Sequence, residues 1–99
     1  MIVERALIPV TPGSEADFEA AMQQAKGVVA QAKGFRSIRV TRGIESPSTY
    51  LLILEWDTLE DHTVGFRESE LFTQWRGLIG QYFAEPPSVE HYTPIDDEA

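Results

Sequence analysis

The sequence predicts an α+β domain of the ferredoxin-like class, in which the order β-α-β-β-α-β places two helices on one face of a four-stranded antiparallel sheet. Three observations indicate this fold. The segment 50–56, YLLILEW, is apolar on both faces, as is typical of a strand in the middle of a sheet. A second strand of this kind opens the chain at 2–10. Helical spacing of apolar residues then follows each of the two strands.

The first helix is expected to begin after the strand at 2–10. Ser14 follows a Thr-Pro-Gly turn and is a typical N-cap residue, and Gly34 is a typical stop, so the helix is predicted to run to about Lys33. We expect Gly27, inside this helix, to mark close packing on the sheet. The inward stripe has offsets of three and four and consists of Phe18, Met22, Ala25, Val29 and Ala32.

The remaining elements complete the predicted pattern. The strand 35–43 carries three arginines, which is typical of a sheet edge. Thr58 can cap a second helical region, which we expect to break near Gly65 and to restart at Ser69. After Pro-Pro, a short last strand is predicted at 88–92. The apolar stripe of the second helical region contains Leu71, Phe72, Trp75, Leu78, Ile79 and Tyr82.

This topology leaves one face of the sheet without a cover. The first and third strands are central, and both helices lie on one face. The other face carries either Leu51 and Ile53 or the opposite set of side chains of the same strand. Because no further element is left in the chain to cover them, we expect a homodimer that packs two sheets face to face into an α+β barrel. The single domain is predicted to span 1–95, with an acidic tail at 96–99.

Composition excludes several classes of function. The 99 residues suffice for one core, and no segment is long and apolar enough to suggest a membrane span or a signal peptide. The chain has no cysteine, which makes the cytoplasm the expected location. The net charge is −8, and residues 50–99 hold 2 Lys/Arg against 11 Asp/Glu. Such an acidic surface repels nucleic acid, so nucleic-acid binding is not expected.

The chain resembles the antibiotic biosynthesis monooxygenase (ABM) domain family. The resemblance is carried by Glu55-Trp56 at the end of the third strand, by His62 in a short helix, by the segment 66–75 (FRESELFTQW) and by the closing segment 89–92 (VEHY). It extends over nearly the whole chain. It implies a dimeric α+β barrel with a cavity in each subunit between the sheet and the helices. Characterised members of the family include cofactor-free oxygenases that convert polycyclic phenols to quinones, heme-degrading enzymes and proteins that act on quinol-like signals.

The heme-degrading branch of the family fits this sequence poorly. Its pattern places a heme-ligating histidine in the second half of the last helix, which corresponds to the region of Trp75 and Arg76, where no histidine occurs. The asparagine of its first strand is also missing from residues 2–10. Heme is therefore not the expected substrate.

A cofactor-free oxygenase needs a base, a donor for the developing oxyanion and a dry aromatic pocket. His62 is the predicted catalytic base, because an ordinary imidazole titrates near neutral pH. Arg39 or Tyr50 could hold the oxyanion. The predicted pocket residues that bind a small aromatic or quinol-like substrate are Trp56, Phe66, Phe72, Trp75 and Tyr82. No metal, nucleotide or flavin site is predicted, because neither metal-ligand spacing nor a glycine-rich phosphate loop occurs.

Structural roles remain open for the same residues. The aromatic side chains can be core, and His62 can be a structural hydrogen bonder. Glu4 and Glu55 can lie inside as a base, although salt bridges to Arg5 or Arg39 are the expectation. His91 is expected at the surface or at a subunit interface. The sequence thus leaves three functions open: a cofactor-independent monooxygenase, a non-enzymatic dimeric protein that binds a small molecule, and an isomerase- or lyase-like relative.

Overall fold

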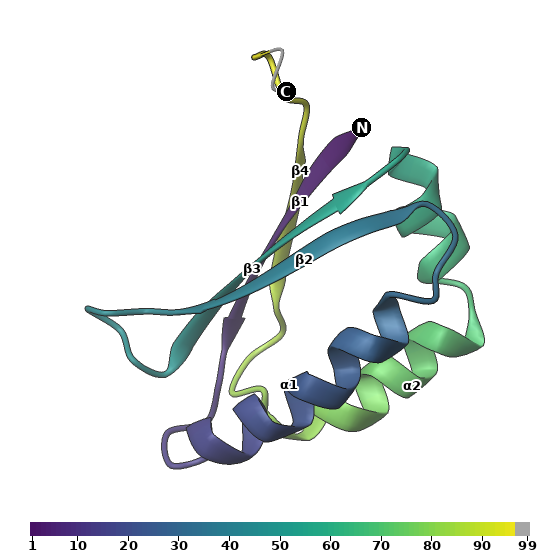
Figure 1. The fold of residues 1–99 in the computed structure, drawn as a ribbon. Helices are drawn as coiled ribbons and strands as arrows, with labels where there is room; N and C mark the ends of the chain where they lie inside the picture. Colours follow the sequence, from purple (N-terminus) through teal and green to yellow (C-terminus); the bar gives the residue numbers. More distant parts are fainter. Residues whose placement is uncertain (97–99) are drawn as a thin grey trace.

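The computed structural model describes residues 1–96, so most of the predicted acidic tail lies outside the described residues. The elements occur in the predicted order, and the two helices α1 and α2 lie on the same side of one sheet (Figure 1). The predicted ferredoxin-like fold is confirmed. Its elements are β1 (Ile2–Pro9), α1 (Glu15–Val29), β2 (Phe35–Arg42), β3 (Thr49–Trp56), the π-helix η1 (Asp61–Phe66), α2 (Glu70–Ile79), the 3-10 helix η2 (Gly80–Tyr82) and β4 (Ser88–Tyr92).

The sheet has the strand order β2-β3-β1-β4, and all of its pairings are antiparallel. β1 and β3 are therefore central and β2 is an edge strand, as predicted. The register places Glu4 of β1 between Leu54 of β3 and His91 of β4. Because paired residues in a sheet point to the same face, Glu4 and His91 share the face that the helices cover.

The core is built on the helix-facing side chains of β3. Tyr50, Leu52, Leu54 and Trp56 are at most 2% exposed. Full burial of an aliphatic side chain such as Leu52 stabilises the fold by about 1.5–3 kcal/mol. The alternate set, which includes Leu51, is only half-buried on the other face. No element within residues 1–96 covers that face.

Helix α1 confirms the predicted stripe and corrects three details. Phe18, Met22, Ala25 and Val29 are buried against the sheet, and Ala32 is half-buried. The helix ends at Val29, before the predicted end at Lys33. Ser14 makes no capping hydrogen bond through its side chain. The expectation for Gly27 was wrong, because Gly27 is exposed and a Cβ there would meet nothing within 4 Å.

The segment after β3 is a π-helix, which the sequence pattern did not indicate. Thr58 accepts a hydrogen bond from the Asp61 backbone N–H at 3.1 Å, so its predicted capping role is confirmed. The Arg67 backbone N–H then donates to the His62 carbonyl at 3.0 Å, five residues back along the chain. This wider turn brings His62, Phe66 and Arg67 to one side of η1. The helical region is interrupted at 67–69 and resumes in α2, as predicted in outline, but Gly65 lies inside η1 and not at the interruption.

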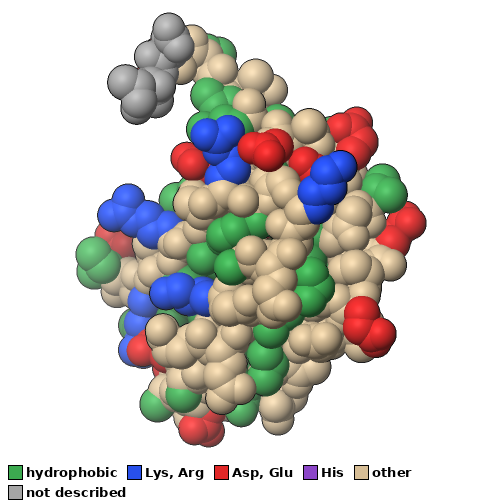
Figure 2. Space-filling model, turned by 45° about the vertical axis from the view of Figure 1, so that its right-hand side comes forward, with side chains coloured by type: hydrophobic (Ala, Val, Ile, Leu, Met, Phe, Trp, Pro, Cys, Tyr) green, Lys and Arg blue, Asp and Glu red, His purple; other side chains and the backbone are tan. Residues whose placement is uncertain are grey.

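On the face shown in Figure 2, hydrophobic side chains are exposed near the centre, and most of the charged side chains lie around them. No helix within residues 1–96 has the length and apolar character needed to cross a membrane.

Gly34 is a position at which both the backbone and the surroundings disfavour a side chain. Its φ is +82°, and a Cβ would overlap the Asp61 carboxylate at the start of η1. Gly34→Ala is therefore expected to lower the free energy of unfolding by about 2 kcal/mol, because an L side chain is strained at positive φ. Urea denaturation measures this change.

The matched control is Gly27→Ala, which adds the same methyl group to an exposed helical position with free space around it. It should raise stability by up to about 1 kcal/mol. Equal effects of the two substitutions would contradict the tight contact between Gly34 and η1.

Candidate active site

A cavity of about 410 Å³ lies between the sheet and the elements η1 and α2. This volume suits a small ligand. Its wall combines aliphatic, aromatic and ionisable side chains. The lining residues include Glu4, Ala6, Ile8, Leu54, His62, Phe66, Arg67, Phe72, Trp75, Arg76, Phe83 and Val89.

A carboxylate forms part of the cavity wall. The side chain of Glu4 is 7% exposed, and its Oε1 accepts a hydrogen bond of 2.9 Å from the indole N–H of Trp56. Trp56 is fully buried at the end of β3. An indole N–H can only donate, so this contact fixes the position of one carboxylate oxygen. Among the described residues, no hydrogen-bond donor reaches the other oxygen, Oε2.

His62 joins this carboxylate to a second histidine. Its Nε2 lies 3.4 Å from Glu4 Oε1, and its Nδ1 lies 2.8 Å from Nε2 of His91. The short contact between the two imidazoles requires one ring nitrogen to donate and the other to accept, and the Glu4 carboxylate lies beside the remaining nitrogen of His62. A network thus runs from Trp56 through Glu4 and His62 to His91, which is half-buried on β4.

Aromatic rings hold the imidazole of His62 in place. Its ring stacks on Trp56 with centroids 5.2 Å apart and an interplanar angle of 25°. The ring of Phe66 is also roughly parallel to the imidazole, with an interplanar angle of 26° and centroids 6.2 Å apart. Phe66 also makes edge contacts with Phe72 and Trp75 at 5.6 and 6.0 Å. Part of the cavity wall is therefore a cluster of aromatic rings in mutual contact, against which a flat ring can pack.

Burial shifts the pKa values in this network toward the neutral forms. Desolvation raises the pKa of Glu4, although the Trp56 hydrogen bond and the Arg67 charge oppose it. Desolvation, followed by the charges of His91 and Arg67, lowers the pKa of His62 to about 4. Desolvation and the Arg67 charge also lower the pKa of His91. At neutral pH the imidazole is uncharged, and the carboxyl is a stronger base than an ordinary glutamate.

The structure brings together half of the predicted site residues. His62, Phe66, Phe72 and Trp75 line the cavity. Trp56 does not line it, but lies behind His62 and positions Glu4.

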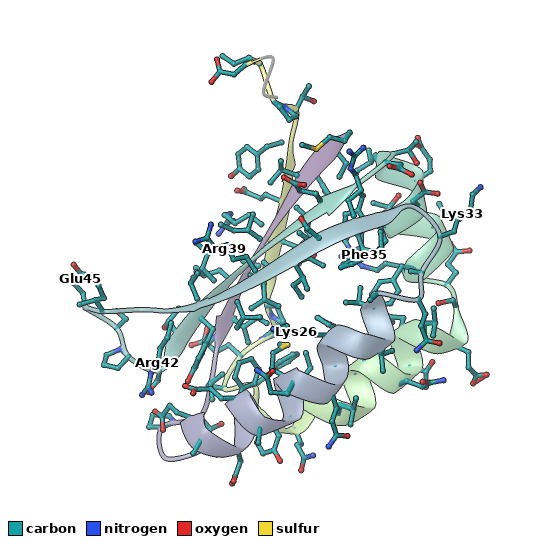
Figure 3. The ribbon with its side chains drawn as sticks, in the orientation of Figure 1. Lys26, Lys33, Phe35, Arg39, Arg42 and Glu45 are labelled. Atoms are coloured by element: carbon teal, nitrogen blue, oxygen red, sulfur yellow. The ribbon has the colours of Figure 1, made fainter. Side chains whose placement is uncertain are left out.

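The other three predicted site residues lie outside this cavity. Tyr82 is half-buried in η2. Arg39 projects from β2 on the side of the sheet away from the helices (Figure 3), and Tyr50 is buried against Phe18, where its hydroxyl donates to Glu19. Burial and the Glu19 contact raise the pKa of Tyr50 to about 12. Neither Arg39 nor Tyr50 can therefore donate to an oxyanion beside His62.

Two residues of the network make contacts that differ from those expected from the sequence. The expected salt bridge from Glu4 to Arg5 is wrong, because Glu4 accepts a hydrogen bond from Trp56 and lies beside His62, while Arg5 pairs with Glu90 at 2.9 Å. His91 is not a free surface residue, because it contacts His62. A signal for Glu4 exists in the sequence: it lies at an inward position of a strand whose neighbours Ala6 and Ile8 are buried.

Metal binding has no support in the described part of the chain. No group of three or more His, Cys, Asp or Glu side chains within residues 1–96 is arranged to hold an ion.

The neutral state of His62 predicts a specific dependence of stability on pH. The pKa of His62 is 6.5 in the unfolded chain and about 4 in the folded protein, so the unfolded state binds more protons between these values. Stability from this group is present above pH 6.5 and is lost as the pH falls toward 4. Between pH 7 and pH 5 the loss is about 2 kcal/mol.

Urea denaturation of wild type and His62→Gln at both pH values isolates this effect. The variant keeps a polar side chain at position 62 and cannot titrate, so its stability should fall by about 2 kcal/mol less than that of the wild type. An equal fall in both proteins would show that His62 is not held neutral.

Comparison with known proteins identifies the family of this chain. The sequence profile described as "Antibiotic biosynthesis monooxygenase" matches residues 1–78. The protein YczJ of Bacillus subtilis (strain 168), which is uncharacterised, is 36% identical over 95 residues, covering 96% of this chain and 100% of its own. A crystal structure from Bordetella bronchiseptica, assigned to the same family, is 45% identical with a TM-score of 0.92 and covers 95% of this chain and 96% of its own. SnoaB, a cofactor-independent oxygenase from Streptomyces nogalater, shares the fold at 15% identity, with a TM-score of 0.80 and coverage of 96% and 93%. The chain belongs to the antibiotic biosynthesis monooxygenase family.

Proposed function

We propose that this protein oxidises a small phenol or quinol-like aromatic molecule with molecular oxygen and without a bound cofactor. The observation that carries the proposal is the buried pair Glu4–His62 on the wall of an aromatic-lined cavity. Membership in the monooxygenase family supports it. The shared fold of SnoaB shows that this architecture accommodates cofactor-independent oxygenation.

The reaction needs no external reductant. A phenol with a free ring position and one O₂ give a quinone and one water, so the substrate supplies all four electrons. The first step is loss of the phenolic proton, because the phenolate gives up electrons to oxygen far more readily than the neutral phenol. The protein must therefore supply a base and stabilise the phenolate.

The base in this proposal is the pair rather than His62 alone. Both nitrogens of His62 already have neighbours, Glu4 and His91. Oε2 of Glu4 has no donor among the described residues, and the side chain lines the cavity. The substrate proton then moves to Glu4 Oε2. Burial strengthens this base by raising the pKa of Glu4.

The remaining cavity residues bind the substrate. Phe66, Phe72 and Trp75 stack on and enclose the aromatic ring, and they exclude water from the reacting oxygen. Arg67 replaces Arg39 as the donor to the phenolate, because Arg67 lines the cavity and its charge acts on both Glu4 and His62.

Oxygen uptake with a panel of hydroxyarenes tests this proposal. Glu4→Gln and His62→Ala are each expected to lower kcat/KM by about 10²–10⁴, since each removes part of the base. Lys33→Gln is the matched control, because Lys33 is exposed and does not line the cavity. Full activity of Glu4→Gln would show that this carboxylate is not the base.

The same panel separates the alternative functions. Turnover without oxygen consumption would indicate an isomerase or a lyase. Ligand-induced shifts in Tm without turnover of any compound would indicate a binding protein. Either result would replace the oxygenase proposal.

We further propose that the protein acts as a homodimer through the open face of the sheet. Val3, Leu7, Leu51 and Ile53 on this face are only half-buried in the single chain. A second copy would remove them from water, with Arg5 and Glu90 already paired beside them. A cytoplasmic location remains the prediction from the sequence.

Light scattering at micromolar concentration tests the dimer. The wild type is expected at twice the mass of the 99-residue chain. Ile53→Lys should be monomeric, because it places a charge in the proposed interface. Val64→Lys, at a position 50% exposed on the helical side, is the control and should stay dimeric. A folded wild-type monomer would contradict the proposal.

A further inference from the structure

The basic residues of the otherwise acidic second half of the chain lie at the cavity. Residues 50–99 contain two basic side chains, Arg67 and Arg76, against eleven acidic ones. Both arginines are exposed and both line the cavity, so both lie where it meets solvent. A net charge of −8 repels anions in general, which makes this local positive charge a specific feature of the cavity entrance.

Arg76 has no carboxylate partner among the described residues. Three other arginines, Arg5, Arg36 and Arg42, form salt bridges at 2.9–3.3 Å. The Arg76 guanidinium lies instead over the rings of Phe72 and Phe83, at 6.0 and 5.6 Å. Both rings line the cavity. Stacking on two rings orients the guanidinium while leaving its N–H donors available.

The two arginines lie in different electrostatic surroundings. The Arg67 charge influences the pKa values of Glu4, His62 and His91. Arg76 is not among the charges that shift these three pKa values. The cavity therefore has a proton-accepting region beside Arg67 and a separate cationic region beside Phe72 and Phe83.

We propose that the cavity binds a flat aromatic molecule that carries an anionic substituent, with Arg76 as the residue that binds that substituent. The aromatic walls hold the ring, the hydroxyl group faces Glu4, and a carboxylate at the other end accepts hydrogen bonds from Arg76. The orientation of the hydroxyl rests on the function proposed above. The preference for an anion does not depend on it.

Two matched probes test this preference: 6-hydroxy-2-naphthoate and its neutral analogue 6-hydroxy-2-naphthamide. They have nearly the same shape and differ in charge at the end opposite the hydroxyl. Calorimetry under nitrogen, at low salt, measures binding without turnover. The Trp75 indole N–H resonance in NMR spectra reports whether each probe occupies the cavity, because Trp75 lines it.

The wild type is expected to bind the naphthoate about tenfold more tightly than the naphthamide, as for one charge-assisted hydrogen-bonded contact. Added salt should reduce this ratio. Arg76→Gln should bring the ratio close to one, whereas Arg76→Lys should retain part of it. Lys33→Gln removes the same charge from an exposed position outside the cavity and should leave the ratio unchanged.

Equal affinity of the two probes for the wild type would overturn the inference. An unchanged ratio in Arg76→Gln, or binding of neither probe at millimolar concentration, would also overturn it. Because these measurements exclude oxygen, they are independent of the oxygenase proposal. A preference for the naphthoate without oxygen uptake would leave the ligand class standing and remove the proposed reaction.

Discussion

The buried carboxylate of Glu4 is the constraint on which the rest of the site depends. A carboxylate on a central strand must find donors inside the protein, because isolated burial of its charge is strongly unfavourable. The donor is the indole N–H of Trp56 at 2.9 Å, and the imidazole of His62 lies beside the same oxygen at 3.4 Å. Trp56 ends β3 and His62 lies in the first turn of η1, so one side chain of β1 contacts two consecutive elements that lie far along the chain from it. His91 extends the connection to β4.

This constraint gives the site its chemical character. The stacked rings around His62 exclude water, and the same exclusion moves the pKa of Glu4 up and that of His62 down. The raised pKa makes the Glu4 carboxylate a stronger proton acceptor, and the lowered pKa keeps the His62 imidazole uncharged at neutral pH. The fold itself carries no such information, because one architecture supports many reactions.

The sequence predicted the fold more completely than the site, for a physical reason. Patterns such as Tyr50–Trp56 or the stripe from Phe18 to Val29 report burial, and burial decides where elements pack. The contacts of Glu4 and His91 depend on strand register, which pairs the two residues directly across β1 and β4. The register depends on how all four strands pair, so the sequence of either strand alone does not predict it.

The π-helix explains a further difference. An ordinary helical turn would place Arg67 away from the face that carries His62, so helical spacing does not predict Arg67 as a site residue. The backbone hydrogen bond from the Arg67 N–H to the His62 carbonyl widens the turn and places the Arg67 guanidinium at the cavity. Strand alternation places Arg39 on the opposite face of its strand from Arg36 and Arg42. Alternation shows which residues of a strand share a face, but it does not show which face the helices cover.

The protonation state of His62 tests this account most directly. Nitrogen-15 NMR of the histidine side chains at neutral pH distinguishes the neutral imidazole from the imidazolium, and it identifies which ring nitrogen carries the proton. The account predicts a neutral ring at His62 that stays neutral down to about pH 5. An imidazolium at pH 7, or titration near the ordinary value of 6.5, would contradict it.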